Sequence, residues 1–566
     1  MFGACLLPAA SPTLAQAKAE ATAEPSARAA AVPLLRQIVA IADVSDLVAA
    51  PPPAVGVNIG RLAIANGSDL EAALAALLNR PIEPALLDEI RAAITGAYVA
   101  AGRPYLDVGF PQQDVTDGVL QVVVSEFRVG RVTVEGNAWF SESQIRWRTG
   151  LQPGQPIDKT ALDLRLSQIN GPFITVTPEF EAGQAPGTTD VVLRTEDRFP
   201  VRLTAGYDNS GNASTGFDRW QLGATWGNAL WLGQVLSYQF TSSANFYVQH
   251  GSSGSQTDGP SYQAHSGSWL IPLPWGHTLT FAGLYSRSVP NIGPDLTSVG
   301  LNENGGVQYA IPAPGLVVAG HALGGTQQFT GGYDFKRTNN NLAFGGTTVS
   351  TGFWDVSQFF LRYDATVPDA LGQTSLQNTL VASPGGMTPY NNNISFALSG
   401  TPGALANYVY DRLMLTRLIP LPRDFGLMLR ATAQAATRQL LPSEQLSIAG
   451  IDAVRGYQEG SITVSTGFQT TVELSSPVFS PSFGLLGPGF SDTAQVHAFW
   501  DYGQGYNRAS VPNSQAKLST ASIGIGGHYY VGDNLTFRVE EGLRLKSVPH
   551  QGANGAFALV SLQVAW

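Results

Sequence analysis

The sequence contains no uninterrupted apolar run of 18 or more residues, although 44% of its 566 residues are hydrophobic. A membrane-spanning helix needs about 20 such residues in succession, so the sequence argues against a helical membrane protein. Charged residues are also scarce, at 13%, whereas the chain contains 62 glycines and 10% aromatic residues. A transmembrane β-barrel accounts for this profile, because its strands alternate apolar and polar side chains and need only about 10 residues each.

Other absences narrow the functional classes. The single cysteine, Cys5, excludes a disulfide framework and a cysteine-based metal site. The net charge of −10, without a basic cluster, offers no footprint for nucleic acid. The local motifs of P-loop nucleotide-binding proteins, zinc proteases, serine hydrolases and dithiol redox proteins are missing, and the seven histidines are scattered. We therefore expect no enzyme, cofactor or metal, although a serine lipase with distant partner residues stays open.

Residues 1–17, MFGACLLPAASPTLAQA, resemble a signal peptide that ends after Ala17, but no basic residue precedes Lys18. A misassigned start codon would explain the missing basic end, and the triplet Gly-Ala-Cys at 3–5 could instead imitate a lipoprotein box.

The segment 31–48 has helix-like spacing of its apolar residues, and three prolines at 51–53 would end a helix. We expect a helix and a Pro-rich linker over 18–54. A plug helix and a disordered remnant are both compatible with it.

Two small α+β modules are expected over 55–127 and 128–199, each in the order strand, helix, helix, strand, strand. The elements expected in the first module are a strand in VGVNIGRLAI, helices at Leu70–Leu78 and Pro84–Ala101, and strands at Tyr105–Phe110 and Val119–Ser125. The corresponding segments of the second module are RVGRVTVEGN, SESQIRWRTG, DKTALDLRLSQING, VTPEFEAG and DVVLRTED. Two units of about 70 residues with one order of elements indicate an internal repeat.

From residue 200 to 566 the helical period gives way to alternation. In VRLTAGYD, Val201, Leu203, Ala205 and Tyr207 share one face, and the residues between them share the other. This is the pattern of a barrel strand, apolar toward lipid and polar toward the lumen. Sixteen such segments can be counted, which allows about 23 residues for each strand with its connection. We expect a 16-stranded antiparallel transmembrane β-barrel, and fourteen strands would also fit.

Short and long connections alternate between these strands. Short ones lie in LWLGQ, PLPWG, LPRDF and VGDN, and long ones include NFYVQHGSSGSQTDGPS and SPGGMTPYNNN. Outer-membrane barrels have short periplasmic turns and long external loops. Counting from a periplasmic N-terminal module makes 440–465 the sixth external loop. The arginine in GIDAVRGYQEG, Arg455, is therefore expected on a loop.

Strand parity identifies side chains that face the lumen. In AQVHAFWDYG the apolar residues form one face, so His497, Phe499 and Asp501 are expected on the other. Glu473, in GFQTTVELSSP, is expected to face the lumen by the same argument. The last candidate strand ends at Trp566, and an aromatic residue there resembles the signal read by the barrel assembly machinery, although tryptophan is also common at membrane interfaces.

The two modules and the barrel together, residues 55–566, resemble the superfamily in which POTRA (polypeptide-transport-associated) domains precede a 16-stranded barrel. It includes the BamA insertase and the two-partner secretion transporters (TpsB; the ShlB/FhaC/HecB group). Two POTRA units favour the two-partner group. The first barrel segment, YDNSGNASTGFDRWQLGATWGNALWLGQVLSYQF, resembles that group's opening hairpin, with its Asp-Asn-Ser-Gly, Ser-Thr-Gly and Asn-x-x-x-x-Gly pieces.

In that superfamily a Val-Arg-Gly-Phe/Tyr motif of the sixth loop folds back into the barrel, where its arginine contacts the aspartate of a Phe-x-Asp motif on strand thirteen. The residues that match the two motifs here are Val454, Arg455, Gly456 and Tyr457, and Phe499 and Asp501. The resemblance implies a lumen latch between Arg455 and Asp501, with Glu473 and His497 as further support. The alternative is a solvated loop charge and an unrelated pore-lining acid.

The resemblance also implies how a client binds. An exposed edge strand of a POTRA sheet can pair with an extended chain, and the candidate edges are Leu106 to Phe110 and Val176 to Phe180. These strands could equally complete their sheets and do nothing more.

The function implied is two-partner secretion: an outer-membrane transporter that recognises an unfolded exoprotein through periplasmic POTRA domains and passes it to the cell surface without ATP. Its implied partners are an exoprotein with an N-terminal secretion domain, outer-membrane lipid and the barrel assembly machinery, and we expect a monomer that binds no nucleic acid. The alternatives are a BamA-like insertase for outer-membrane proteins, or a passive porin.

Overall fold

The described part of the chain forms two compact units. The computed structural model describes residues 32–49, 51–52, 54–60, 62, 64, 66–244, 259–292, 296–318, 321–344, 347–482, 491–508, 517–549 and 551–566. The first unit comprises Met1–Ala101, as far as it is described, with Leu106–Ser125, and the second comprises Gly102–Tyr105 with Glu126–Trp566. The signal-like segment 1–17, which includes Cys5, lies outside the described residues. Among the described helices, none has the length and apolar character needed to cross a membrane.

The first unit is a four-stranded sheet with the strand order β2-β1-β4-β3, packed against two helices. Its elements are β1 (Gln37–Ile41), the 3-10 helix η1 (Val44–Asp46), β2 (Gly56–Asn58), α1 (Gly67–Ala75), α2 (Pro84–Ala100), β3 (Leu106–Gly109) and β4 (Val119–Glu126). The core lies between sheet and helices, where Ile90 and Ile94 of α2 meet Ile38 and Val122 of the sheet. Pro84 opens α2, a position where its missing N–H costs no hydrogen bond.

The helix expected within 31–48 is wrong. Residues Gln37–Ile41 form β1, a central strand that pairs in parallel with β2 and with β4. A short apolar run does not reveal by its spacing whether it is a helix or a strand. Here β-branched residues fill the run, and a partner strand on each side satisfies its backbone groups.

This correction also moves the first strand of the module. In the first module the strand that pairs in parallel with β4 is β1, and not the expected VGVNIGRLAI. The first strand of the second module, β5, pairs in the same way with the last strand of that module. Within VGVNIGRLAI only β2 forms, as an additional edge strand of three residues.

The second module has all five elements expected from the sequence. They are β5 (Arg128–Glu135), α3 (Glu142–Thr149), α4 (Lys159–Ile169), β6 (Ile174–Ala182) and β7 (Thr188–Asp197), with the sheet order β5-β7-β6. The side chains of Ser141 and Asp158 accept hydrogen bonds from the first turns of α3 and α4, and Gly150 ends α3 in the left-handed conformation.

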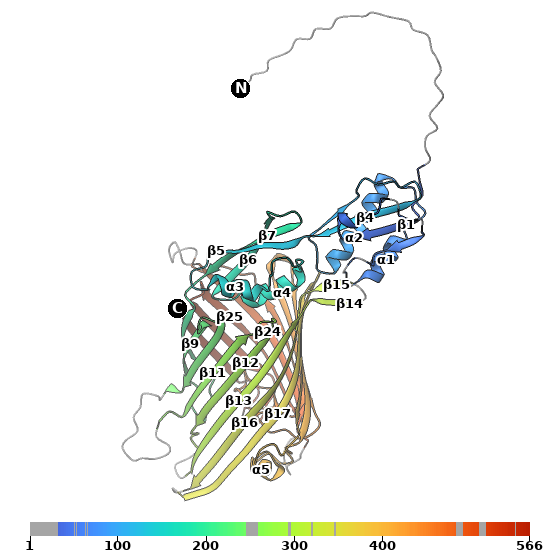
Figure 1. Ribbon diagram of the computed structural model, residues 1–566. Helices are drawn as coiled ribbons and strands as arrows, with labels where there is room; N and C mark the ends of the chain where they lie inside the picture. The colour runs from blue at the N-terminus through green and yellow to red at the C-terminus, as the bar shows by residue number, and fades with distance from the viewer. Residues whose placement is uncertain are drawn as a thin grey trace, which may run out of the picture. The chain divides into compact units, whose positions relative to one another are not determined.

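A closed barrel of sixteen strands follows, so the larger of the two expected strand counts is confirmed. Neighbouring strands such as β11, β12 and β13 lie side by side in the barrel wall (Figure 1). Neighbours pair antiparallel, and β27 closes the barrel against β8. The strands are β8 (Val201–Asp208), β9 (Arg219–Ala229), β10 (Gln234–Ser242), β11 (Tyr262–Pro272), β12 (Thr278–Ser288), β13 (Leu296–Ala313), β16 (Thr326–Phe344), β17 (Thr347–Asp369), β18 (Gly372–Ser383), β19 (Tyr408–Pro420), β20 (Gly426–Ala436), β23 (Thr466–Ser475), β24 (Asp492–Tyr506), β25 (Lys517–Val531), β26 (Leu535–Arg544) and β27 (Ala556–Ala565).

Shorter elements lie in the connections. They are β14 (Leu316–Val318), β15 (His321–Gly324), α5 (Asn393–Ala397), the 3-10 helix η3 (Pro422–Asp424), β21 (Leu446–Ser447) and β22 (Thr463–Val464). The connections expected to be short are short, and β19 and β20, for example, are separated by five residues. Residues 437–465 between β20 and β23 form the sixth connection on the side opposite the short turns, as counted from the sequence, although the fourth on that side, between β16 and β17, has only two residues; residues 437–465 are called loop 6 below.

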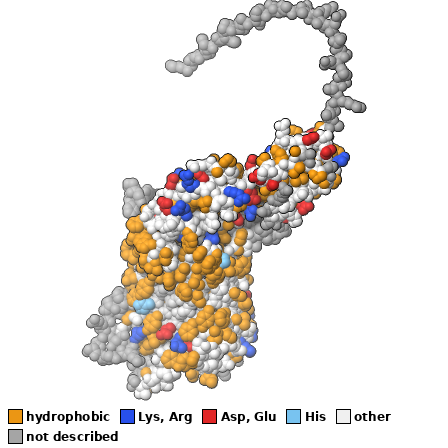
Figure 2. Space-filling view, viewed as in Figure 1, with side chains coloured by type: hydrophobic (Ala, Val, Ile, Leu, Met, Phe, Trp, Pro, Cys, Tyr) orange, Lys and Arg blue, Asp and Glu red, His pale blue; other side chains and the backbone are white. Residues whose placement is uncertain are grey.

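The outer wall of the barrel is apolar. Large hydrophobic side chains such as Trp220, Leu222, Val496 and Trp500 are exposed there, and Figure 2 shows hydrophobic side chains covering much of the visible barrel surface. The alternate residues of each strand point inward. This arrangement is the one expected for strands whose outer face contacts lipid.

The second module is attached to the first short turn of the barrel. Gln144 of α3 donates a hydrogen bond of 2.9 Å to the side chain of Asn228, which in turn donates one of 3.0 Å to the carbonyl of Trp139. The Asn228 side chain also accepts a bond from the N–H of Gly233, across the turn. The Asn-x-x-x-x-Gly piece of the opening hairpin therefore closes the turn and holds the module.

Candidate functional site

Loop 6 folds into the barrel instead of extending into solvent. Its residues Ile448, Val454 and Tyr457 are at most 1% exposed, although connecting segments normally lie on the surface. Gly503 and Gly505, on the inward face of β24, leave room for it, because an added Cβ would meet loop-6 side chains at 2.5 to 2.9 Å. The loop is thus packed directly onto the inner wall.

Arg455 lies at the centre of this contact and reaches the carboxylate of Asp501 on β24, the thirteenth barrel strand. Its Nε donates to Oδ2 at 2.8 Å and its Nη2 to Oδ1 at 2.9 Å, and its backbone N–H adds a third bond of 3.1 Å. Asp501 is fully buried and Arg455 is 7% exposed. Two parallel bonds from a planar guanidinium fix both distance and orientation.

The remaining guanidinium nitrogen, Nη1, contacts two more carboxylates. It lies 2.9 Å from Oε2 of Glu473 on β23 and 3.2 Å from Oε2 of Glu540 on β26. The guanidinium also stacks on Phe499, with its Cζ 3.4 Å from the ring centre. Glu473 and Phe499 were expected on the inward face, whereas Glu540 was not foreseen.

The backbone at the tip of loop 6 passes against β26. Gly456 has a φ of +88°, and a Cβ on it would meet the carbonyl oxygen of Gly542 at 2.6 Å. Neither glycine therefore tolerates a side chain at this crossing. Arg544 donates a bond of 2.9 Å to the carbonyl of Gly456, and the hydroxyl of Tyr457 donates one of 2.7 Å to the carbonyl of Lys546.

A second anchor holds the base of loop 6 on other strands. The buried carboxylate of Glu444 accepts a bond of 2.7 Å from Lys336 on β16, one of 2.9 Å from Gln358 on β17 and one of 3.1 Å from the hydroxyl of Tyr410 on β19. Arg412, also on β19, donates a hydrogen bond to the backbone carbonyl of Glu444. Sequence reasoning missed Glu444, because an acidic residue in a long loop carries no periodic signal.

His497 faces the lumen as expected, but among the described residues it forms no hydrogen bond with Arg455. Its Nε2 lies 3.7 Å from Glu540 and 3.9 Å from Glu473, beyond hydrogen-bond distance. Its imidazole neighbours Phe499 and the imidazole of His528.

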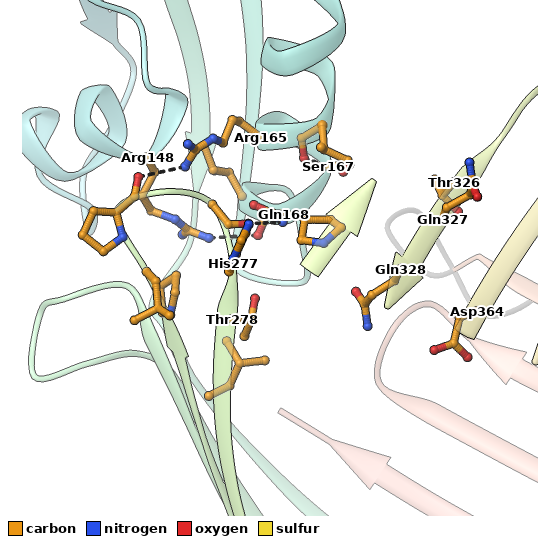
Figure 3. A pocket seen from close by; sticks show the side chains of 18 of the residues that line it. Arg148, Arg165, Ser167, Gln168, His277, Thr278, Thr326, Gln327, Gln328 and Asp364 are labelled. Carbon is orange, nitrogen blue, oxygen red and sulfur yellow. Dashed lines mark hydrogen bonds between the residues drawn. The ribbon is translucent and has the colours of Figure 1, made fainter. Parts of the chain in front are cut away.

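A cavity of about 500 Å³ lies where α3 and α4 meet the barrel (Figure 3). Arg148 donates to the carbonyl of Gln168, Arg165 to that of Pro274, and the Gln168 side chain to that of Gly276, at 2.8 to 3.0 Å. Burial lowers the pKa of Arg148 to about 10. Within the described residues neither guanidinium pairs with a carboxylate, and the cavity lining combines these cationic groups with the carboxylate of Asp364 and several apolar side chains.

Both strands expected to be sheet edges are edges: β3 in the first sheet and β6 in the second. The side chains of Leu106 and Phe110 pack on the core of the first unit.

The edge of β6 is partly occupied. Asn170 accepts a bond of 2.7 Å from the N–H of Val176 and donates one of 3.2 Å to its carbonyl, and Pro178 has no N–H to offer. From Phe180 onward, neither Asn170 nor a proline occupies the outer edge of β6.

Comparison with known proteins shows the family to which the chain belongs. The model of the haemolysin secretion/activation proteins ShlB/FhaC/HecB matches residues 187–298 and 406–527, and that of the ShlB-type POTRA domain matches 58–126. The outer membrane transporter CdiB of Escherichia coli O6:K15:H31 (strain 536 / UPEC) is 22% identical over 506 residues, covering 85% of this chain and 79% of that protein. The chain belongs to the ShlB/FhaC/HecB family.

Solved structures of CdiB share the fold. CdiB from Escherichia coli gives a TM-score of 0.76 at 19% identity, with 96% of this chain and 93% of that one covered. CdiB from Acinetobacter baumannii gives 0.64 at 14% identity, with 95% and 91% covered. The ShlB/FhaC/HecB member described here is an outer-membrane transporter of the two-partner secretion family, with its barrel in the outer membrane and its POTRA domains in the periplasm.

Replacing Arg455 by lysine is expected to loosen loop 6. An ammonium group cannot form the two parallel bonds to Asp501 while it also reaches Glu473, and the loss should cost about 1.5–3 kcal/mol. In the folded, detergent-solubilised protein, a protease should cut loop 6 faster than in the wild type. Arg438→Lys, at an exposed arginine of the same loop, should have no effect. Equal cleavage of the Arg455→Lys variant and the wild type would contradict the anchor.

Replacing Lys336 by methionine should destabilise the barrel by about 3–5 kcal/mol, because the buried Glu444 carboxylate then lacks its counter-charge. The double variant Lys336→Met/Glu444→Leu should recover most of this loss. The thermal midpoint for loss of the folded gel mobility in unheated samples measures both. Lys159→Met, which breaks an exposed pair with Asp163, should change stability by less than about 1 kcal/mol. A double variant no more stable than Lys336→Met would rule out the pair.

Proposed function

We propose that this transporter accepts an unfolded exoprotein at its POTRA domains in the periplasm and passes it through the barrel lumen to the cell surface. The observation that carries the proposal is the way loop 6 is held. At Arg455 and Glu444 it is fixed to the wall by charged hydrogen bonds. Because water can replace such bonds when the loop moves, their net contribution is far smaller than their strength in a dry interior. Loop 6 is therefore suited to be a removable plug.

Several features support a path toward this plug. The second module is bonded to the short turns of the barrel, and the cavity beside Arg148 and Arg165 lies at that junction. The polar side chains among its lining residues suit the backbone of an unfolded chain, which must keep its hydrogen bonds on the way to the lumen. Transport would use no nucleotide, and folding of the exported chain outside the cell would favour its outward movement.

Client capture would use open sheet edges. Edge strands present unpaired N–H and C=O groups, to which an extended chain can add as a further strand. Of the two edges foreseen, β3 is the stronger candidate, since Asn170 and Pro178 occupy or blunt the first half of β6.

The function is tested by secretion of the partner exoprotein from cells that carry Arg455→Ala or Arg438→Ala. We expect Arg455→Ala to reduce secretion at least about tenfold, which corresponds to a rise of about 1.4 kcal/mol in the barrier of the rate-limiting step. The barrel should be less stable, because buried carboxylates lose a counter-charge, but it should still insert, because the strand ladder does not involve this side chain. Normal secretion by a correctly inserted Arg455→Ala variant would overturn the role of the anchor. In a deletion strain, broad outer-membrane defects would indicate an insertase, and altered solute permeability alone a porin.

The capture step is tested with a photo-cross-linking residue at Asp107, the exposed position of β3, and at Glu71 on α1 as the matched acidic control. We expect cross-links to the N-terminal region of the exoprotein from position 107 and few or none from position 71. Equal yields at the two positions would exclude β3 as a specific docking edge.

A further inference from the structure

Three metal-ligating side chains meet on the inner wall of the barrel beside loop 6. They are His497 on β24, His528 on β25 and Glu540 on β26, and one ligand atom of each lies within 4.8 Å of the other two. The strand register explains the meeting. Gly526 lies directly between His497 and Glu540 across the three strands, and His528 follows two residues later on the same face.

Gly526 leaves the space in which the ligand atoms converge. An added Cβ at this glycine would lie 2.5 Å from Nε2 of His497 and 2.8 Å from Cγ of Glu540. The two side chains therefore reach toward each other over a residue that has no side chain. Donor atoms around a tetrahedral zinc ion lie about 3.3 Å apart, for bonds of about 2.0–2.1 Å. Modest side-chain rotations would therefore bring the three ligand atoms to the distances that an ion requires.

The Nε2 atom of His497 has no hydrogen-bond partner among the described residues, although the side chain is only 2% exposed. Buried polar atoms in folded proteins almost always have a partner, and an orphaned one needs a reason. This atom points to Glu540 Oε1, at 3.7 Å. The two atoms are close but do not form a hydrogen bond. A cation placed between them could bind both the imidazole nitrogen and the carboxylate oxygen.

The charges around the cluster favour a cation. The carboxylates of Glu473, Asp501 and Glu540 gather here, and the guanidinium groups of Arg455 and Arg538 are their partners. One negative charge is left over. Two imidazoles and one carboxylate are a donor set that suits zinc and neighbouring first-row divalent ions, and not magnesium or calcium, which prefer oxygen.

We propose that His497, His528 and Glu540 bind a first-row divalent transition-metal ion such as Zn²⁺ in the barrel lumen. The site shares Glu540 with loop 6, because Oε2 of this carboxylate accepts from Arg455 at 3.2 Å and Oε1 from Arg538 at 2.6 Å. A bound ion competes for these oxygens and so weakens one of the contacts that hold the loop tip. The proposal is independent of what the transporter carries.

The test uses the untagged full chain, refolded in detergent and stripped of metal with a chelator. Co²⁺ is titrated as a spectroscopic substitute, with Zn²⁺ as competitor, and the visible absorption of the bound Co²⁺ is followed. We expect one ion per chain. His497→Ala and His528→Ala should each weaken binding by about tenfold or more, whereas His265→Ala, which removes an imidazole from β11 at the barrel wall, should not.

Two further variants keep all three ligands. Gly526→Ala should abolish binding by filling the space between His497 and Glu540, and Arg538→Gln should strengthen binding severalfold by freeing Oε1 of Glu540. Unheated gel mobility shows that each variant is folded. The proposal fails if the wild type binds neither Co²⁺ nor Zn²⁺, if the double variant His497→Ala/His528→Ala binds as the wild type does, or if Arg538→Gln weakens binding.

Discussion

Three carboxylates from neighbouring or nearby barrel strands face the single guanidinium of Arg455, and they do so only while loop 6 is folded inward. Asp501 and Glu540 are almost completely buried, so without this guanidinium the wall would hold like charges with little water to screen them. The dependence runs in both directions. The loop needs the wall for its bonds, and the wall needs the loop for its counter-charge.

The apolar contacts around this ion cluster give the loop its shape. Val454 and Ile448 pack where β24 offers glycines, and Gly456 crosses Gly542 at backbone contact. Glycine at these positions lets the backbone of loop 6 lie directly against the barrel wall. Any side chain there would push the loop tip off the wall and stretch the bidentate bonds of Arg455. Polar bonds fix the position of the loop, and small residues on two strands make that position accessible.

Much of this could be predicted from the sequence, because barrel strands repeat with a period of two. Alternation placed Asp501, Phe499 and His497 inward, and counting connections placed Arg455 on loop 6. The inward position of Glu540 was not predicted, because LTFRVEEGLR has two adjacent glutamates and a register error of one residue exchanges their faces. Glu444 escaped because its partners lie on three strands far away in the sequence. β1 was mistaken for a helix, since only its partner strands reveal its conformation.

Loop 6 is attached at two places, through Glu444 to β16, β17 and β19, and through Arg455 to β23, β24 and β26. Such a segment acts as a cross-brace between two parts of the wall. Detaching one end leaves the segment still held to the wall at the other. In the transport proposed above, brief loss of either anchor through thermal motion would leave loop 6 inside the barrel, and an open passage would require the two events to coincide.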